Sequence, residues 1–179
     1  MRKKLWEIYP SIWKTEAAFM SWIRGGVRRG LWEKHPFKLN FIKNNRIMIP
    51  NPNPRGKKKE VWGGRCAITG ELFVQTQLEV DHKQGGHSLK RFEDIAKFIE
   101  GIIYVTEDEL QFISKEAHRT KSYSDRMGID FNVADAERKA ILLIKDKKDV
   151  DFLKDVGIIP GSNQAKRRAQ IVKYLLEQK

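Results

Sequence analysis

Two short stretches of the sequence combine residue types that can act on a phosphate ester. Residues 79–82 end an alternating apolar and acidic segment and place Asp81 beside His82. Residues 114–121 carry His118, which two cations follow closely. An imidazole can take a proton from water near neutral pH, and Asp and His can hold a divalent cation that polarises a phosphate. The residues alone leave two interpretations open: phosphodiester cleavage, or histidines that are surface or hydrogen-bonded structural residues.

Short strands are expected around the first stretch. Residues 72–74 and 78–82 have the composition and alternation of strands. Two short apolar runs, at 102–105 and 110–113, are also compatible with strands. We therefore predict strands at all four places.

Helices are expected in much of the remaining chain. Apolar spacing predicts helices over 15–31, 88–100, 114–127, 134–145 and 150–156, and a last helix after Ser162. Ser88, Ser114 and Ser162 are the expected N-caps, and Gly128 is the expected stop. Pro36 is expected to end the basic helical segment.

The predicted helix over 15–31 has one apolar stripe and a basic remainder. The stripe consists of Phe19, Trp22, Ile23, Val27 and Leu31. We interpret this stripe as core packing. Arg24, Arg28 and Arg29 lie off the stripe and are the better candidates to bind phosphate. Gly25 and Gly26 either weaken the helix or let another backbone approach closely.

Positive charge is concentrated in the first third of the chain. The net charge is +12, of which residues 1–60 carry +11 and residues 61–179 only +1. All five tryptophans lie in or just after this basic third: Trp6, Trp13, Trp22, Trp32 and Trp62. Such a field with interleaved aromatic residues favours a polyanionic partner. The alternatives are a solvated basic surface over a small aromatic core, and contact with an acidic membrane face.

Composition excludes several classes of protein. With 40% hydrophobic and 32% charged residues, the chain is typical of a soluble globular protein. Its longest apolar run, 140–144, is far shorter than the roughly 20 residues of a membrane span. Residues 1–6 are basic and no apolar segment follows them, so no secretory signal is expected. We therefore expect a cytoplasmic location. Cys66 is the single cysteine, which excludes an internal disulfide framework.

Five short motifs occur in the order typical of one nuclease family. They are Cys66-Ala67-Ile68-Thr69-Gly70-Glu71, Glu79-Val80-Asp81-His82, Gly85-Gly86-His87-Ser88-Leu89, Leu110-Gln111-Phe112-Ile113 and His118-Arg119-Thr120-Lys121. Over about residues 66–126 the chain resembles the HNH endonucleases, in particular the small HNH proteins encoded by bacteriophages. That family builds its site as the ββα-metal arrangement. The resemblance implies an α+β fold: a mainly helical chain with a central ββα-metal motif, in which a two-stranded antiparallel sheet lies against a helix.

The resemblance also implies roles for individual residues. His82 matches the general base that activates water, Asp81 the metal-binding acid, and His118 the helix residue that completes the metal site. The implied cofactor is Mg²⁺, or Mn²⁺ or another divalent cation, since carboxylate oxygens suit Mg²⁺ and an imidazole ligand widens the choice. Arg119 and Lys121 are then expected to bind phosphates that flank the cleaved bond.

Two positions depart from the family's pattern. Alignment on His118 places Glu109 where many relatives have an Asn that fixes the loop of the catalytic His. Glu109 is expected to serve there as an acceptor or to approach the metal, and the alternative is that 106–109 forms a capping box. Many relatives also bind structural zinc through two Cys-x-x-Cys pairs. Because Cys66 alone remains, no structural zinc is expected, and Cys66 is interpreted as a buried small residue.

Three further residues keep open roles. On a strand, Glu79 shares a face with Asp81, and it either supports the metal or pairs with a surface lysine. His87 either contacts substrate or stabilises its loop. His35, in the basic segment, is interpreted as incidental.

The leading hypothesis is a metal-dependent HNH DNA endonuclease, phage-encoded and acting in the host cytoplasm. Residues 1–60 would be a basic, Trp-rich helical DNA-binding arm with a linker at 50–59, whose Lys57, Lys58 and Lys59 contact DNA. Residues 61–128 would be the nuclease core and 129–179 a helical accessory segment. The family leaves 5′-phosphate and 3′-hydroxyl ends, and one site cuts one strand, so a double-strand break needs a homodimer or two events.

Two other classes of function stay open. The first is a non-catalytic DNA-binding or packaging accessory protein on an altered HNH scaffold. The second is an RNA-binding protein or ribonuclease, because the phosphate chemistry is shared. No membrane partner is expected in any of these readings.

Overall fold

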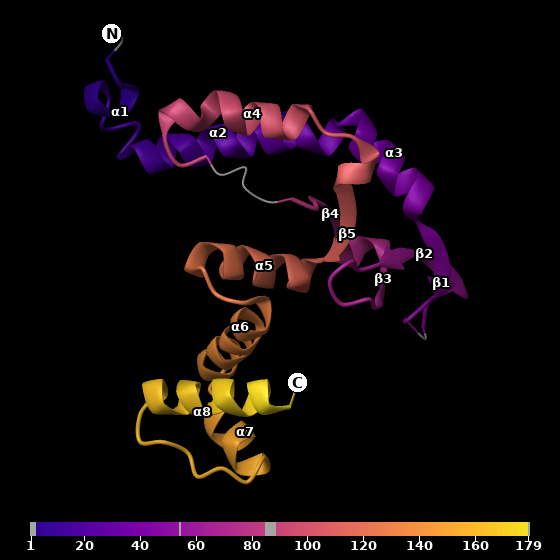
Figure 1. Cartoon of the computed structure of the whole chain (residues 1–179), viewed down its shortest axis with the longest axis vertical. Coiled ribbons are helices and arrows are strands. Elements are labelled where there is room, and N and C mark those ends of the chain that lie inside the picture. Colours follow the sequence, from indigo (N-terminus) through magenta and orange to yellow (C-terminus); the bar gives the residue numbers. More distant parts are fainter. Residues whose placement is uncertain (1–2, 54, 85–88, 179) are drawn as a thin grey trace. The chain divides into compact units, whose positions relative to one another are not determined.

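The chain folds into two units, one mixed and one helical. The computed structural model describes residues 3–53, 55–84 and 89–178. The first unit, Met1–Ser114, contains all the strands of these residues, and the second unit, Lys115–Lys179, is built from helices (Figure 1). The α+β class and the mainly helical character are therefore confirmed. The sequence predicted boundaries after residues 60 and 128, whereas the structure has one division into compact units, after Ser114.

The first unit begins with three helices, α1 (Leu5–Ile8), α2 (Glu16–Gly30) and α3 (Pro36–Asn45). The predicted helix over 15–31 is confirmed by α2, whose N-terminus is capped because Thr15 Oγ1 accepts from the Ala18 amide at 3.1 Å. The expectation that Pro36 ends a helix is wrong. Pro36 is the first residue of α3, where its missing N–H would have no helical partner in any case.

Two small antiparallel sheets follow. Strands β1 (Ile47–Pro50), β2 (Glu60–Arg65) and β3 (Leu72–Val74) form one sheet in that order, and β4 (Leu78–His82) pairs with β5 (Leu110–Ser114) in the other. The strand predictions at 72–74, 78–82 and 110–113 are confirmed. β1 and β2 were not predicted. The segment 50–59 was interpreted as a linker, but its first residue, Pro50, belongs to β1, which pairs antiparallel with β2.

Helix α4 (Ile95–Ile103) corrects two expectations. The predicted strand at 102–105 is wrong, because Ile102 belongs to this helix and packs with Phe98 one turn earlier. A short apolar run cannot by itself distinguish a strand from the end of a buried helix. The helix also starts later than predicted, after a 3₁₀ turn over Phe92–Asp94. The Asp94 carboxylate accepts from the amides of Lys90 and Arg91, and the expected cap, Ser88, lies outside the described residues.

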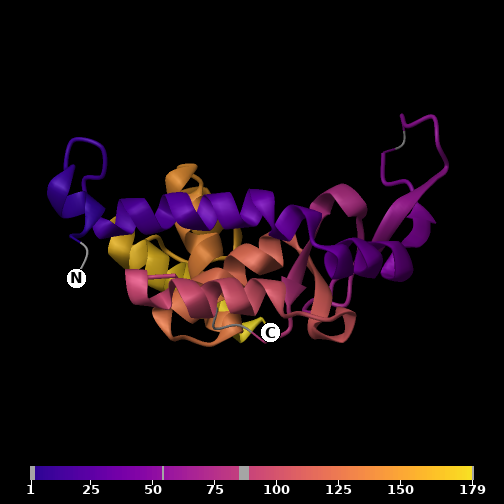
Figure 2. The ribbon, with the colours of Figure 1, turned by 90° about the horizontal axis from the view of Figure 1, so that it is seen from above.

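The core of the first unit consists of two clusters that share Trp32. One lies against β4 and β5 and contains Phe41, Leu78, Val80, Val105, Leu110 and Phe112. The other lies between α2 and α4, which run side by side (Figure 1, Figure 2), and contains Phe19, Met20, Leu89, Phe98 and Ile102. Of the predicted stripe on α2, Phe19, Ile23 and Val27 pack into this cluster, while Trp22 is 59% exposed.

The second unit contains four helices among its described residues: α5 (Lys115–Met127), α6 (Phe131–Lys145), α7 (Asp149–Asp155) and α8 (Gln164–Glu177). Gly128, with φ of +65°, ends α5 as predicted. The cap of α8 is Asn163, not Ser162, because the Asn163 side chain accepts from the Lys166 amide at 2.9 Å. Ala140, Leu153 and Ile171 are fully buried and form one core cluster of this unit. Within the described residues, none of the helices is long and apolar enough to cross a membrane.

Candidate functional site

Strand β4 positions the predicted acid and base at its end. Asp81 pairs with Gln111 and His82 with Leu110 in the antiparallel register with β5. Because side chains alternate along a strand, His82 shares the core face with Leu78 and Val80, and Asp81 shares the other face with Glu79. Glu79 and Asp81 therefore share a face of the strand, as predicted, and the imidazole of His82 lies on the opposite face.

The His82 imidazole lies against Trp32. The two rings stack with centroids 4.7 Å apart and an interplanar angle of 26°. The Lys38 ammonium lies 5.2 Å from the centroid of the same indole and 2.7 Å from Glu33 Oε2. Trp32 comes from a 3₁₀ turn, Trp32–Lys34, between α2 and α3. Sequence reasoning missed this contact, because fifty residues separate the two rings and the only signal was a tryptophan in the basic segment.

Glu109 is engaged locally through its side chain and distantly through its backbone. Its Oε2 accepts from the Thr106 amide at 2.8 Å and from the Thr106 hydroxyl at 3.0 Å, which is the capping-box alternative. Its backbone carbonyl accepts from the Lys83 amide at 2.8 Å. Residue 109 thus holds the chain directly after His82, but it does so through its carbonyl oxygen.

His118 lies in the first turn of α5, in the second unit. The predicted acid and base therefore belong to one unit and the predicted imidazole ligand to the other. Within the residues that the structure describes, no three His, Cys, Asp or Glu side chains are grouped so that they could hold a metal ion.

Cys66 is fully buried beside the end of β5. Its Sγ accepts from the Ser114 amide at 3.3 Å, and the Ala67 amide donates to the Phe112 carbonyl at 2.8 Å. Burial would raise the pKa of the Cys66 thiol, but hydrogen bonds from the Thr69 side chain and the Ser114 backbone outweigh it and lower that pKa. The buried packing role predicted for Cys66 is confirmed. Its sulfur also accepts a hydrogen bond from Ser114, the last residue of the first unit.

The predicted phosphate-binding residues differ in how accessible they are. Arg28 and Arg29 on α2 are exposed, and so are Lys57, Lys58 and Lys59 in the hairpin connection and Arg119 on α5. Arg24 is half-buried and donates to the Leu89 carbonyl at 2.5 Å, so it serves the fold of the first unit. Lys121 is half-buried on α5.

Of the two remaining histidines, the structure describes His35. His35 is buried, and its Nε2 lies 3.1 Å from the Ile103 carbonyl, which makes it a structural residue. His87 lies outside the described residues.

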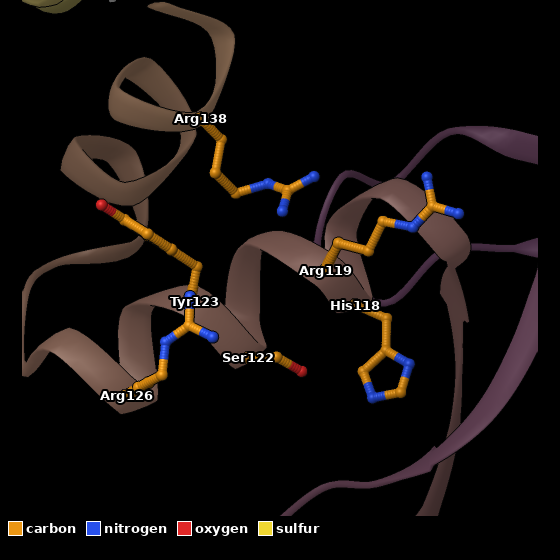
Figure 3. Close-up of a pocket in the computed structure, with 6 residues that line it drawn as sticks. All are labelled: His118, Arg119, Ser122, Tyr123, Arg126 and Arg138. Atoms are coloured by element: carbon orange, nitrogen blue, oxygen red, sulfur yellow. The ribbon is translucent and has the colours of Figure 1, made fainter. Parts of the chain in front are cut away.

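A pocket of about 280 Å³ opens beside His118 in the second unit (Figure 3). Its lining residues are His118, Arg119, Ser122, Tyr123, Arg126 and Arg138. Only His118 and Arg119 were predicted. The spacing of 118, 122 and 126 would have placed those residues on one helix face, whereas Arg138 comes from α6 and has no signal in the sequence.

Comparisons with protein-family models, with curated proteins and with solved structures found no match for this chain.

Proposed function

We propose that the chain is a metal-dependent endonuclease of the HNH type that hydrolyses phosphodiester bonds in DNA. The observation that carries this proposal is the order of elements around the candidate residues. β4 ends in Asp81 and His82, β5 pairs antiparallel with it, and α5 follows β5 directly with His118 in its first turn. This is the strand–strand–helix order that the ββα-metal arrangement requires.

The donor set suits a divalent cation. Asp81 offers carboxylate oxygens and His118 an imidazole nitrogen, and Mg²⁺ is commonly held by one or two protein ligands while water and substrate phosphate fill its remaining positions. Two protein ligands can therefore suffice, and the proposal requires that Asp81 and His118 bind the same ion. When bound, the cation supplies neutralisation of charge on the phosphate and stabilisation of the leaving 3′ oxygen.

The chain's own residues accept the proton and bind the substrate. His82 takes a proton from the attacking water. The Trp32 ring limits the orientation of the imidazole, and the bond from the Lys83 amide to the Glu109 carbonyl fixes the backbone beside it. Arg119 and Lys121 would bind phosphates that flank the cleaved bond. The products would carry 5′-phosphate and 3′-hydroxyl ends, and one site would nick one strand.

DNA is the proposed substrate because of the distribution of positive charge. Residues 1–60 carry a net charge of +11, and the exposed Arg28, Arg29 and the lysines at 57–59 belong to this part. Cations in such number bind a polyphosphate backbone through counterion release without regard to sequence.

The test is nicking of supercoiled plasmid in Mg²⁺, in Mn²⁺ and in EDTA. We expect nicked product from the wild type with metal and none in EDTA. His82→Ala should reduce the nicking rate at least about 100-fold, the usual contribution of a general base, and leave DNA affinity unchanged. Asp81→Asn should also abolish nicking, whereas Asp125→Asn, an exposed acid on α5, should not.

Nicking that persists in His82→Ala at the wild-type rate would contradict the assignment of the base. A wild type that binds DNA and cuts with neither metal would favour the second candidate, a non-catalytic DNA-binding protein. The observation that favours a non-catalytic protein is that the imidazole of His82 stacks against Trp32 on the core face of β4. Equal competition by RNA in the same Mg²⁺ reaction would redirect the proposal to a ribonuclease.

A further inference from the structure

The pocket on the second unit gathers hydrogen-bond donors and positive charge. Five of its six lining residues come from α5, and Arg138 reaches in from α6 (Figure 3). None of the six is aliphatic. Three are arginines, whose guanidinium groups donate and never accept, and Ser122 and Tyr123 add hydroxyl groups that can donate.

The arginines are partly pre-oriented. The Arg138 Nη2 is held by Glu116 Oε1 at 2.9 Å, while its Nε is buried and has no hydrogen-bond partner among the described residues. The Arg126 guanidinium lies 5.3 Å from the centroid of the Tyr123 ring. Tyr123 in turn has its hydroxyl 3.4 Å from Arg168 Nη2. Ring and carboxylate contacts of this kind reduce the entropy lost when a guanidinium binds an anion.

The balance of charge at the pocket is positive. Glu116 is the acid that contacts the lining arginines, at 2.9 Å from Arg138 and 3.7 Å from Arg119. Among the contacts described for the lining arginines, one carboxylate faces two of the three guanidinium groups, so positive charge is in excess. The second unit as a whole has 15 Lys and Arg against 10 Asp and Glu, so its field also favours an anion.

We propose that this pocket binds a backbone phosphate of DNA through Arg126, Arg138 and Ser122. Planar guanidinium groups that donate two parallel bonds match phosphate oxygens. The inference rests on the proposed function, because His118 lines the same pocket. It adds that α6, outside the HNH-like segment, helps to hold the substrate.

The experiment measures binding of fluorescently labelled duplex DNA to the full chain in EDTA, by anisotropy, over a series of salt concentrations. Arg126→Gln and Arg138→Gln should each lower affinity about tenfold at low salt. Each should also reduce the slope of log K against log[salt] by about 1, as expected when one phosphate contact is lost. Lys139→Gln, next to Arg138 in sequence but paired with Asp135 on its own helix, is the matched control and should leave the slope unchanged.

Arg126 is exposed, so its variant tests the pocket without the loss of a buried partner, and circular dichroism establishes that both variants are folded. A slope that stays at the wild-type value in Arg126→Gln, or that changes equally in Lys139→Gln, would overturn the proposal. So would an effect on RNA binding without one on DNA. This experiment measures binding and not cleavage, so its outcome is independent of the nicking assay. If the pocket binds DNA but the protein never nicks it, the nuclease proposal is wrong and the proposal of a phosphate site is not.

Discussion

At the scale of single residues, the stack of His82 on Trp32 is the contact that most constrains the candidate base. The indole packs against both core clusters of the first unit, so its position is set by the fold and not by the site. A general base acts only within hydrogen-bond reach of its proton, and small displacements are costly to the rate. Trp32 is therefore a positioning residue for His82.

Replacing Trp32 tests this contact directly. Trp32→Leu should lower the free energy of unfolding by about 2 kcal/mol, because it removes buried aromatic area and the ring pair. The His82 ring protons should lose the upfield shift that a stacked indole imposes, and two-dimensional NMR measures both protons. Trp32→Phe should retain part of the stability and part of the upfield shift of the His82 ring protons.

The matched control is Trp62→Leu. Trp62 is 44% exposed and contacts the Arg46 guanidinium at 4.2 Å, so its loss should cost less than about 1 kcal/mol and leave His82 unaffected. His82 resonances that do not move in Trp32→Leu would show that the stack does not form in solution.

Which residues could be predicted depends on how far apart their partners lie in sequence. Asp81 and His82 at a strand end, and His118 on a helix, followed from local pattern. The capping role of Glu109 was foreseen as an alternative, because a capping box is local. Trp32 and Arg138 were missed, since each acts through a side chain from a different element and no local pattern records such a meeting.

At the scale of elements, the hairpin of β1 and β2 depends on a glycine at residue 63. A Cβ at Gly63 would meet the Phe73 carbonyl oxygen and lie 2.5 Å from Ile49 Cδ1. One neighbour is backbone of the paired strand β3, which cannot move without loss of the ladder. The close approach of strands here explains why a residue with low strand preference lies in the middle of β2.

Two glycine substitutions should therefore change the free energy of unfolding in opposite directions. Gly63→Ala should destabilise the first unit by about 1–3 kcal/mol through overpacking. Gly26→Ala, in the interior of α2 with no atom within 4 Å of the added methyl, should stabilise it by about 1 kcal/mol. Chemical denaturation followed by tryptophan fluorescence measures both, because all five tryptophans lie in the first unit. Equal effects at the two sites would contradict this account.

The elements themselves were predictable where their pattern was long or well punctuated. The helices of the second unit and α2 followed from apolar spacing and from glycine stops. β1 and β2 were missed because a strand is stabilised by its partner, and the Pro- and Asn-rich connection at 51–59 resembles a linker when read alone. The end of α4 was mistaken for a strand because four apolar residues satisfy either periodicity.

At the scale of the whole molecule, the two units have separate core clusters, and the stability of each can be followed by itself. In the second unit, Asp149 is buried, and Arg167 Nε donates to its Oδ2 at 2.6 Å. The hydrogen bond from Arg167 lowers the pKa of the Asp149 carboxyl below its ordinary value. A carboxyl with a lowered pKa in the folded state contributes stability above its unfolded pKa, and this contribution is lost as the pH falls through the folded pKa.

The second unit should therefore lose stability in acid. Its free energy of unfolding, followed by circular dichroism, should decline below about pH 4. Asp149→Asn should reduce that dependence on pH and cost about 2 kcal/mol at neutral pH, because it removes a charge-assisted bond. Asp151→Asn, an exposed acid on the same helix, should keep the wild-type profile. A wild-type profile in Asp149→Asn would show that other groups cause the acid sensitivity.

The three lysines of the hairpin connection have one more consequence for the molecule. β1 is an edge strand whose Ile47 and Met48 are exposed, and an apolar edge invites pairing with another chain. Pro50 removes one backbone donor from that edge, and Lys57, Lys58 and Lys59 repel the same surface on a second copy. The charges proposed to bind a polyanion should thus also oppose association between copies of the protein, and neutralising them should lower solubility together with affinity.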